Sequence, residues 1–162
     1  MTLFKNIYSS PLGDLSLIAD EDSLLGVWFL GQKYFERGLE GPFLDQETEI
    51  LLKTKQALDD YFAGREVDFR DLPLAQRGTA FQERVWAYLR ALSWAETKTY
   101  GQLAQDLGVS SAQAVGGAVG RNPWSILVPC HRVLGSQGQL TGYAGGLEKK
   151  IWLLEHEGLK LR

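Results

Sequence analysis

The residues with the clearest chemical potential lie in one stretch, residues 122–133, which has the sequence NPWSILVPCHRV. It contains the only cysteine of the chain, Cys130, and one of its two histidines, His131. The thiolate is the reactive form of cysteine, and a neighbouring basic group lowers the pKa of a thiol from its usual value of about 8.5. Because an imidazole and a guanidinium follow Cys130 directly, the stretch is a candidate for nucleophilic chemistry at sulfur.

The residues before Cys130 predict how its thiol is positioned. The apolar run 126–128 is typical of a short buried strand, and Pro129 fixes its own φ and lacks a donor, so we expect the strand to end there. Neighbouring side chains of a strand face opposite sides, so a contact between Cys130 and His131 requires a turn or a bridging water. The imidazole also needs an acceptor that fixes its tautomer, and spacing alone does not identify one.

Composition restricts the class of protein. A chain of 162 residues, 44% hydrophobic, is large enough for one ordinary domain or two small ones with a real core. No apolar run approaches the roughly 18 residues of a membrane span, and the N-terminus lacks the pattern of a secretion signal. One cysteine permits no internal disulfide, and with two histidines it leaves no structural zinc cluster. We therefore expect a cytoplasmic or nucleoid-associated protein without metal or cofactor.

Charge is divided unevenly along the chain. Residues 1–75 contain 7 Lys/Arg and 14 Asp/Glu, a net charge of −7, whereas residues 76–162 contain 10 and 6, a net charge of +4. A polyanion would therefore meet the C-terminal half. An accidental asymmetry of solvated faces explains the same numbers.

The two halves also differ in their predicted elements. Three short runs between residues 3 and 30, separated by turn formers, predict a β-meander, and residues 46–62 have helical spacing. The extended segment 65–79 ends at a predicted N-cap, Thr79, so we place a domain boundary there, with domains 1–75 and 76–162.

Residues 76–162 predict a helical domain. Helices are expected from Ala80 to about Ala91, from Thr99 or Tyr100 to Leu107, and from Ser111 onward, with Gly108 in the turn between the last two. Two helices joined by such a turn form a helix-turn-helix, which binds DNA in many proteins. A closing helix is expected over residues 147–156, with Leu147, Ile151 and Leu154 facing inward.

The predicted recognition helix is unusual in its small residues. Ala112, Ala114, Gly116 and Gly117 leave one face almost without side chains. Each interior glycine costs about 1 kcal/mol of helix stability relative to alanine, so the pair calls for a reason. Close approach to a nucleic-acid groove is one, and a helix end or tight helix packing is another. The pattern fits neither the dinucleotide fingerprint nor a phosphate loop.

Together, these motifs resemble the O6-alkylguanine-DNA alkyltransferase family. The resemblance covers residues 79–158 in order, whereas residues 1–75 resemble the family only loosely, through the turn at 10–13 and the meander. Its motifs are 99–104 (TYGQLA), 114–118 (AVGGA), 122–133, 143–147 (YAGGL) and 152–158 (WLLEHEG).

The resemblance implies a reaction and a role for each matching residue. Members of the family flip a damaged guanine out of duplex DNA and transfer its O6-alkyl group to a cysteine. By resemblance, Cys130 is the acceptor, His131 the base acting through a water, Glu157 the carboxylate that orients His131, Asn122 the asparagine that braces the site, and Tyr100 the proton donor to the leaving guanine. The implied base pocket consists of Val128, Tyr143, Ala144 and Gly145. The implied DNA contacts are Gln113, Ala112, Ala114, Gly116, Gly117, Arg121, Arg132 and Ser136.

The family also implies a fold class. We expect an α+β protein, with an N-terminal ribonuclease-H-like domain of structural role and a C-terminal winged helix-turn-helix domain that enters the minor groove as a monomer. Since a thioether is not displaced by water and the chain has no second thiol, each protein accepts one alkyl group. O4-alkylthymine is a second expected substrate.

Two departures from the family pattern affect these expectations. The family's usual arginine wedge corresponds to Gln113, which is shorter and uncharged and supports an extruded base less well. Trp94-Ala95 replaces the usual proline-glycine before Tyr100, so that loop is expected to differ in shape. The zinc ligands of some relatives are also missing.

Three other functions fit parts of the sequence. A non-catalytic protein that binds alkylated bases fits the helix-turn-helix, although Cys130 argues against it. A DNA-binding regulator that senses methylation through Cys130 would need an activation surface. A cysteine hydrolase is disfavoured, because Cys130 and His131 are adjacent in sequence.

Overall fold

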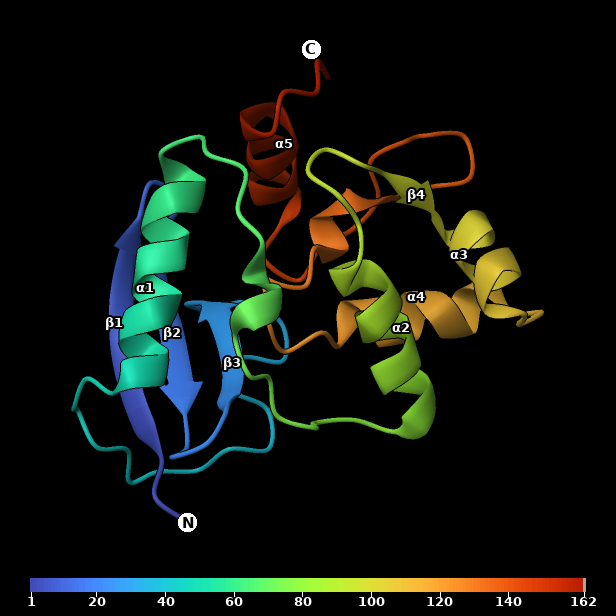
Figure 1. Ribbon diagram of the computed structural model, residues 1–162. Coiled ribbons are helices and arrows are strands. Elements are labelled where there is room, and N and C mark those ends of the chain that lie inside the picture. Colours follow the sequence, from blue (N-terminus) through green and yellow to red (C-terminus); the bar gives the residue numbers. More distant parts are fainter. Residues whose placement is uncertain (162) are drawn as a thin grey trace. The chain divides into compact units, whose positions relative to one another are not determined.

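The computed structural model describes residues 1–161, which form two compact units (Figure 1). Unit 1 comprises Met1–Arg77 and Pro123–Leu127, and unit 2 comprises Gly78–Asn122 and Val128–Arg162. The expected boundary between domains 1–75 and 76–162 lies close to the division at Arg77 and Gly78, and the short segment 123–127 groups with unit 1. Only Val128 separates this segment from the Pro129-Cys130 pair.

Unit 1 is built on a small antiparallel sheet. Strands β1 (Phe4–Ser10), β2 (Gly13–Ala19) and β3 (Leu24–Phe29) lie in that order, which confirms the predicted meander. Helix α1 (Glu49–Phe62) lies along β1 and β2 (Figure 1) and is followed by the 3-10 turn η1 (Phe69–Asp71). The core between sheet and helix contains fully or almost fully buried side chains from β2, β3 and α1, among them Leu15, Leu17, Val27, Leu51, Leu58 and Tyr61.

The free edge of β3 is covered by distant parts of the chain. Val27 N–H donates to the Pro123 carbonyl (2.8 Å), and Ser125 N–H donates to the Val27 carbonyl (2.9 Å). The Trp124 indole N–H donates to the Leu24 carbonyl at 3.0 Å. Because a strand edge offers unpaired donors and acceptors, these bonds fix the segment 123–127 in unit 1.

The strand expected over residues 126–128 is not present. Residues 125–127 form a turn instead, in which Leu127 N–H donates to the Ser125 carbonyl at 2.9 Å. Ile126 has φ +73°, a rare conformation for a β-branched residue. The run is apolar because it is buried, with Ile126, Leu127 and Val128 at most 3% exposed. A buried strand and a buried turn require the same residue types, so the sequence pattern could not separate them.

Unit 2 contains the predicted helix-turn-helix. Helices α2 (Ala80–Arg90), α3 (Tyr100–Leu107) and α4 (Ala112–Gly120) pack together (Figure 1), and Gly116 and Gly117 lie inside α4 rather than at its end. Gly108 ends α3 in the left-handed conformation, with φ +69°, as expected of a helix-stopping glycine. The Trp86 indole N–H donates to the Ala118 carbonyl at 2.8 Å and joins α2 to α4.

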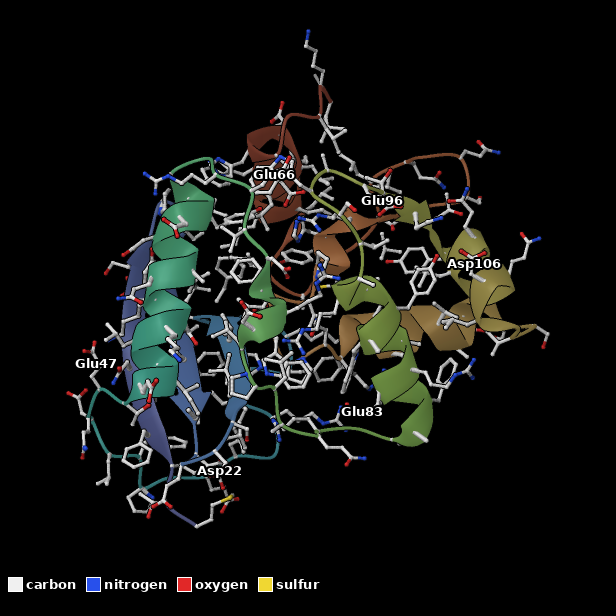
Figure 2. The ribbon with its side chains drawn as sticks, viewed as in Figure 1. Asp22, Glu47, Glu66, Glu83, Glu96 and Asp106 are labelled. Carbon is white, nitrogen blue, oxygen red and sulfur yellow. The ribbon has the colours of Figure 1, made fainter. Side chains whose placement is uncertain are left out.

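Capping and side-chain bonds explain where these helices begin and how they meet. Thr79 and Thr99 form complete capping boxes at the starts of α2 and α3. Figure 2 shows Glu83 on the first turns of α2, where its carboxylate accepts the Gly78 N–H at 2.8 Å. Figure 2 also shows Asp106 on α3, whose carboxylate accepts the Tyr88 hydroxyl of α2.

The remaining elements of unit 2 surround the cysteine. Strands β4 (Lys98–Thr99) and β5 (Val133–Leu134) form a two-stranded parallel sheet, and η2 (Cys130–Arg132) is a single 3-10 turn. Helix α5 (Leu147–His156) closes the unit. Ile151 and Leu154 face inward as predicted, but Leu147 is 43% exposed, so its predicted burial is wrong. Within residues 1–161, no helix is long and apolar enough to cross a membrane.

Candidate active site around Cys130

Cys130 begins the 3-10 turn η2 and is almost completely buried, at 7% exposure. Its N–H donates to the Val128 carbonyl at 2.7 Å. Successive residues of a 3-10 helix differ by about a third of a turn rather than the half turn of a strand. Cys130 and His131 are therefore not forced onto opposite sides, which the expected strand would have done.

His131 is held by a buried carboxylate. Its Nε2 lies 2.6 Å from Oε2 of Glu157, and both side chains are fully buried. Burial lowers the pKa of His131 and outweighs the opposite effect of Glu157. A neutral imidazole has one N–H, and the bond to Glu157 places it on Nε2. Nδ1 is buried and has no hydrogen-bond partner among residues 1–161, so it is the nitrogen that can accept a proton.

The carboxylate of Glu157 is surrounded by hydrogen-bond donors. Besides His131, Arg132 Nε donates to Oε1 at 2.7 Å and the Ala95 N–H donates to Oε1 at 3.2 Å. Burial raises the pKa of Glu157, but the bonds and charges of His131 and Arg132 outweigh it and hold the pKa well below its usual value. Glu157 is thus an ionised, buried anchor for the imidazole and not a solvated acid at the end of a helix.

The position of Arg132 corrects one prediction. We expected Arg132 to contact DNA, but its side chain is only 8% exposed and its guanidinium also donates to the Leu92 carbonyl at 3.2 Å. A buried cation beside Glu157 compensates the carboxylate charge. The prediction of a DNA contact is wrong, because the guanidinium is occupied inside unit 2.

The thiol itself is in an environment that favours its neutral form. Burial raises the pKa of Cys130, while a hydrogen bond from Asn122 and the charge of Lys150 lower it by less. The sequence suggested the reverse, because adjacent basic residues usually stabilise a thiolate. His131 is neutral and Arg132 is paired with Glu157, so neither supplies a free positive charge to the sulfur. Reaction at Cys130 therefore needs a base.

Asn122 is buried beside the cysteine turn. Its side-chain N–H donates to the Val128 carbonyl at 2.7 Å, and Asn122 is 4% exposed. The bond joins the two residues on either side of the segment 123–127. Asn122 and Val128, predicted as a bracing residue and a pocket residue, thus meet directly.

Tyr100 and Tyr143 also approach the predicted site. Tyr100 is the first residue of α3, and burial raises its pKa, so the phenol keeps its proton at neutral pH. A Cβ placed on Gly116 would lie 3.7 Å from the Tyr100 ring, so α4 passes close to it. The Tyr143 ring is 6.4 Å from the His131 ring at an interplanar angle of 82°. Ala144 and Gly145 follow in the same loop and are half-buried.

The residues predicted to contact DNA lie mostly on the exposed part of α4. Ala112, Gln113 and Ala114 are exposed, and Gly116 and Gly117 are half-buried. Arg121 Nη1 donates to the Gly117 carbonyl at 2.9 Å, so its side chain folds back on α4. Ser136 is exposed in the turn after β5.

Three residues around the site were not predicted. They are Ala95, Thr141 and Lys150. The N–H of Ala95 donates to the Glu157 carboxylate, and Thr141 lowers the pKa of Tyr100. The side chain of Lys150 is completely buried. Lys150 had a recognisable signal, since residues 150, 153, 154 and 157 share one helical face and all are buried. Ala95 and Thr141 had none. No group of three His, Cys, Asp or Glu within residues 1–161 could hold a metal ion.

Comparison with known proteins assigns both halves of the chain to one family. Residues 3–76 match the ribonuclease-like domain of 6-O-methylguanine DNA methyltransferase, and residues 80–159 match its DNA binding domain. These matches confirm the predicted fold class.

Individual relatives agree over nearly the whole chain. The methylated-DNA–protein-cysteine methyltransferase of Methanosarcina acetivorans is 42% identical over 96% of this chain and 99% of its own. That of Haemophilus influenzae is 40% identical over 96% of this chain and 86% of its own.

Solved structures show the same similarity in three dimensions. Mycobacterium tuberculosis OGT in complex with DNA has a TM-score of 0.84 and 37% identity, covering 97% of this chain and 92% of that one. The O6-methylguanine-DNA methyltransferase of Pyrococcus kodakaraensis has a TM-score of 0.74 and 27% identity, covering 98% of this chain and all of that one. Together with the family models and the buried Cys130–His131–Glu157 arrangement, these likenesses establish that the chain belongs to the 6-O-methylguanine DNA methyltransferase family.

Proposed function

We propose that the chain repairs O6-alkylguanine in duplex DNA by transferring the alkyl group to the sulfur of Cys130. The observation that supports this most directly is the 2.6 Å bond between His131 Nε2 and Glu157 Oε2, buried next to the only thiol. It fixes the imidazole as a base beside a cysteine that burial keeps protonated. General-base activation is what such a thiol needs to become a nucleophile.

The proposed transfer is a single displacement. His131 Nδ1 takes the thiol proton through a bridging water, and Cys130 Sγ attacks the alkyl carbon. The S–C bond forms as the C–O6 bond breaks, and its electron pair passes to the guanine. Tyr100 then donates its phenolic proton to the leaving guanine, and His131 and Tyr100 regain their original states by proton exchange with solvent. Glu157 remains ionised throughout and orients His131.

Substrate recognition is assigned to two parts of unit 2. The Val128 carbonyl, the Tyr143 side chain and the backbone N–H groups of Ala144 and Gly145 are proposed to bind the flipped base. The DNA contacts are assigned to α4 and its surroundings, without Arg132. They comprise Ala112, Gln113, Ala114, Gly116, Gly117, Arg121 and Ser136.

The chemistry implies one turnover per protein. The product at Cys130 is a thioether, which water does not cleave, and the sequence contains no second thiol to accept the group. We further propose that the protein acts as a monomer in the cytoplasm or on the nucleoid, without metal or cofactor, and that unit 1 has a structural role. O4-alkylthymine is proposed as a second substrate.

Mass spectrometry of the protein after incubation with duplex DNA containing O6-methylguanine tests the proposal. Cleavage after Arg121 and Arg132 releases a peptide that contains Cys130, and this peptide should gain the mass of one methylene group. The Cys130→Ser variant should bind the same DNA without gaining mass. Unmodified wild-type protein that still binds the damaged duplex would instead indicate a non-catalytic binder. Methyl transfer that continues beyond one group per protein would refute the single-turnover mechanism. A strong change in affinity for a specific DNA sequence after methylation would indicate a regulator.

A further inference from the structure

A cluster of three aromatic rings joins the end of α5 to the loop after α2. The His156 ring lies flat against the Trp152 ring, with centroids 4.7 Å apart and an interplanar angle of 15°. The Trp94 ring meets the His156 ring at a centroid distance of 6.3 Å and an angle of 58°. All three side chains are half-buried. The proposed steps of alkyl transfer use none of these rings.

Trp94 belongs to a tight turn between α2 and β4. The Glu96 N–H donates to the Ser93 carbonyl at 3.0 Å, which closes a four-residue turn with Trp94 and Ala95 in the middle. Ala95, at the third position, has φ +62°. A positive φ at this position is typical of a type II turn, which favours glycine or asparagine there. An alanine in this conformation is strained, and such strain persists only where surrounding contacts enforce it.

The turn supplies one contact of the buried carboxylate. The Ala95 N–H donates to Glu157 Oε1 at 3.2 Å. Leu92, just before the turn, accepts a bond from Arg132 Nη1 at 3.2 Å, and its own N–H donates to the Leu89 carbonyl in the last turn of α2 at 3.0 Å. The Leu92 contact is therefore fixed by the end of a helix, whereas the Ala95 contact depends on the conformation of the turn.

Two pairs of consecutive residues meet where the turn approaches α5. Trp94 contacts His156 through its ring, and the next residue, Ala95, bonds to the residue after His156, Glu157. The bond from the Ser93 N–H to the carboxylate of Glu96, a residue labelled in Figure 2, lies within the turn and cannot tie it to α5. The ring contact can, and aromatic pairs at such distances attract each other beyond the apolar area that they bury.

We propose that Trp94 and His156 are positioning residues for the buried Glu157. Their ring contact holds the turn 93–96 at α5 and so keeps the strained Ala95 N–H on the carboxylate. This inference rests on the proposed function, because it assigns the rings a task in orienting the catalytic base. The rings act through Ala95 and Glu157, and they do not contact the reacting atoms.

Ring removal gives the first test. For Trp94→Ala and His156→Ala, single-turnover methyl transfer from O6-methylguanine DNA should slow about tenfold, since small displacements of supporting groups reach effects of this size. Trp94→Phe and His156→Phe keep a ring and should change the rate less than about threefold. Leu52→Ala, at a partly exposed leucine of α1, is the control and should react as wild type. Wild-type rates in Trp94→Ala, or equal losses in His156→Phe and His156→Ala, would overturn the proposal.

The backbone at Ala95 offers a rescue that general loss of packing does not predict. Glycine adopts a positive φ without strain, so the turn would keep its conformation without the rings. Ala95→Gly added to Trp94→Ala should therefore bring the transfer rate back to within about threefold of wild type. Ala87→Gly, at an exposed residue of α2, should give no rescue in the same background. A double variant as slow as Trp94→Ala, or equal rescue by both glycines, would contradict the proposed role.

Hydrogen exchange shows whether the loss is local. In Trp94→Ala, the amide of residue 95 should exchange faster, whereas the amides of α3 and α4 should keep their protection. The double variant should restore the slow exchange at residue 95. Faster exchange throughout unit 2 would overturn the proposal. If Trp94→Ala does not fold, Trp94→Leu replaces it in every comparison, because leucine keeps an apolar contact but has no ring.

The outcome for the rings can be distinguished from a failure of the proposed function. If wild-type protein does not accept a methyl group from DNA, the repair function fails whatever Trp94 and His156 do. The exchange rate at residue 95 would still report whether the rings hold the turn.

Discussion

The surroundings of Cys130 and the proposed DNA-binding surface of unit 2, the first turn of α4, have opposite characters. Around Cys130, the side chains of His131, Arg132 and Glu157 are almost completely buried and joined by bonds of 2.6 and 2.7 Å. The first turn of α4, residues 112–114, is exposed, contains no charge and consists of two alanines and a glutamine. The surroundings of Cys130 depend on a few exact contacts between charged groups, whereas the first turn of α4 is defined by its small, uncharged side chains.

This difference predicts how the two parts respond to mutation. In the buried part, removing one partner leaves another charge without compensation, which typically costs 3–5 kcal/mol. On the exposed α4, a substitution would change only one of the proposed solvated contacts with a phosphate or a base, so we expect its effect to be smaller and to depend on salt. Variants in the buried part should therefore have larger effects on activity and stability than variants on α4, and only the effects on α4 should depend on salt concentration.

The largest effect is expected for Glu157→Gln. The substitution removes the charge that holds the His131 tautomer and leaves Arg132 buried without an anion. By analogy with other carboxylate–histidine pairs, the rate of methyl transfer from O6-methylguanine DNA should fall roughly 100-fold or more. Single-turnover kinetics with a radiolabelled duplex measures it. The control is Glu148→Gln, at an exposed residue of the same helix. A loss below tenfold would mean that Glu157 does not control the base.

The stability contributed by Glu157 should depend on pH in a defined direction. Its pKa in the folded protein lies well below the ordinary value of 4.5. Between these two values the unfolded chain binds a proton that the folded chain does not, so stability rises with pH. The contribution is complete above about pH 5 and is lost as the pH falls below about 4.5, by up to about 1.4 kcal/mol per pH unit.

Urea unfolding of wild type and Glu157→Gln from pH 6 to pH 3.5 measures this effect. The difference in free energy of unfolding should be greatest at pH 6 and shrink below pH 4.5. A difference that stays constant over the range would show that Glu157 titrates normally in the folded protein.

The elements that the sequence predicted correctly depend on local signals, whereas those that it mispredicted depend on contacts between distant residues. The helices α2, α3 and α4 and their caps follow from local signals, since Thr79, Thr99 and Gly108 act within a few residues of themselves. Cys130 and His131 were singled out by their residue types and Glu157 by the resemblance, but their geometry depends on contacts between distant residues. The partner of Arg132 lies 25 residues away, and the strand edge that receives Ser125 lies about 100 residues away. No local pattern encodes such pairs, so the strand before Cys130 and the exposure of Arg132 were mispredicted.

A moderate effect is expected on the exposed side, from Gln113→Arg. The new guanidinium can reach a phosphate or support the gap left by a flipped base, which glutamine does less well. Affinity for damaged duplex, or the transfer rate at limiting DNA, should rise about 3- to 10-fold at low salt. The slope of log affinity against log salt should steepen by about one. Fluorescence anisotropy at several salt concentrations measures both quantities.

Gln56→Arg is the matched control, because Gln56 is exposed on α1 of unit 1 and the substitution adds the same charge to a different helix. An equal gain in both variants would show that net charge alone attracts the DNA. Unchanged affinity and rate in Gln113→Arg would mean that α4 does not need a longer side chain at this position.

The smallest effect is expected at Ala95, where a backbone conformation supports the buried part. Ala95 has φ +62° and directs its N–H to Glu157. An alanine in the left-handed conformation costs about 1–2 kcal/mol, and glycine avoids this cost. Glycine in turn loses more conformational entropy on folding, which costs about 0.5–1 kcal/mol. Because the first term is larger, Ala95→Gly should stabilise the protein by about 0.5 kcal/mol. Ala87→Gly, in the exposed middle of α2, should destabilise it by about 1 kcal/mol. Urea unfolding of both variants compares the signs, and the transfer rate of Ala95→Gly should equal that of wild type because the N–H is retained. If both variants lose the same stability, Ala95 is not strained, and the N–H at Glu157 is held without cost to the backbone.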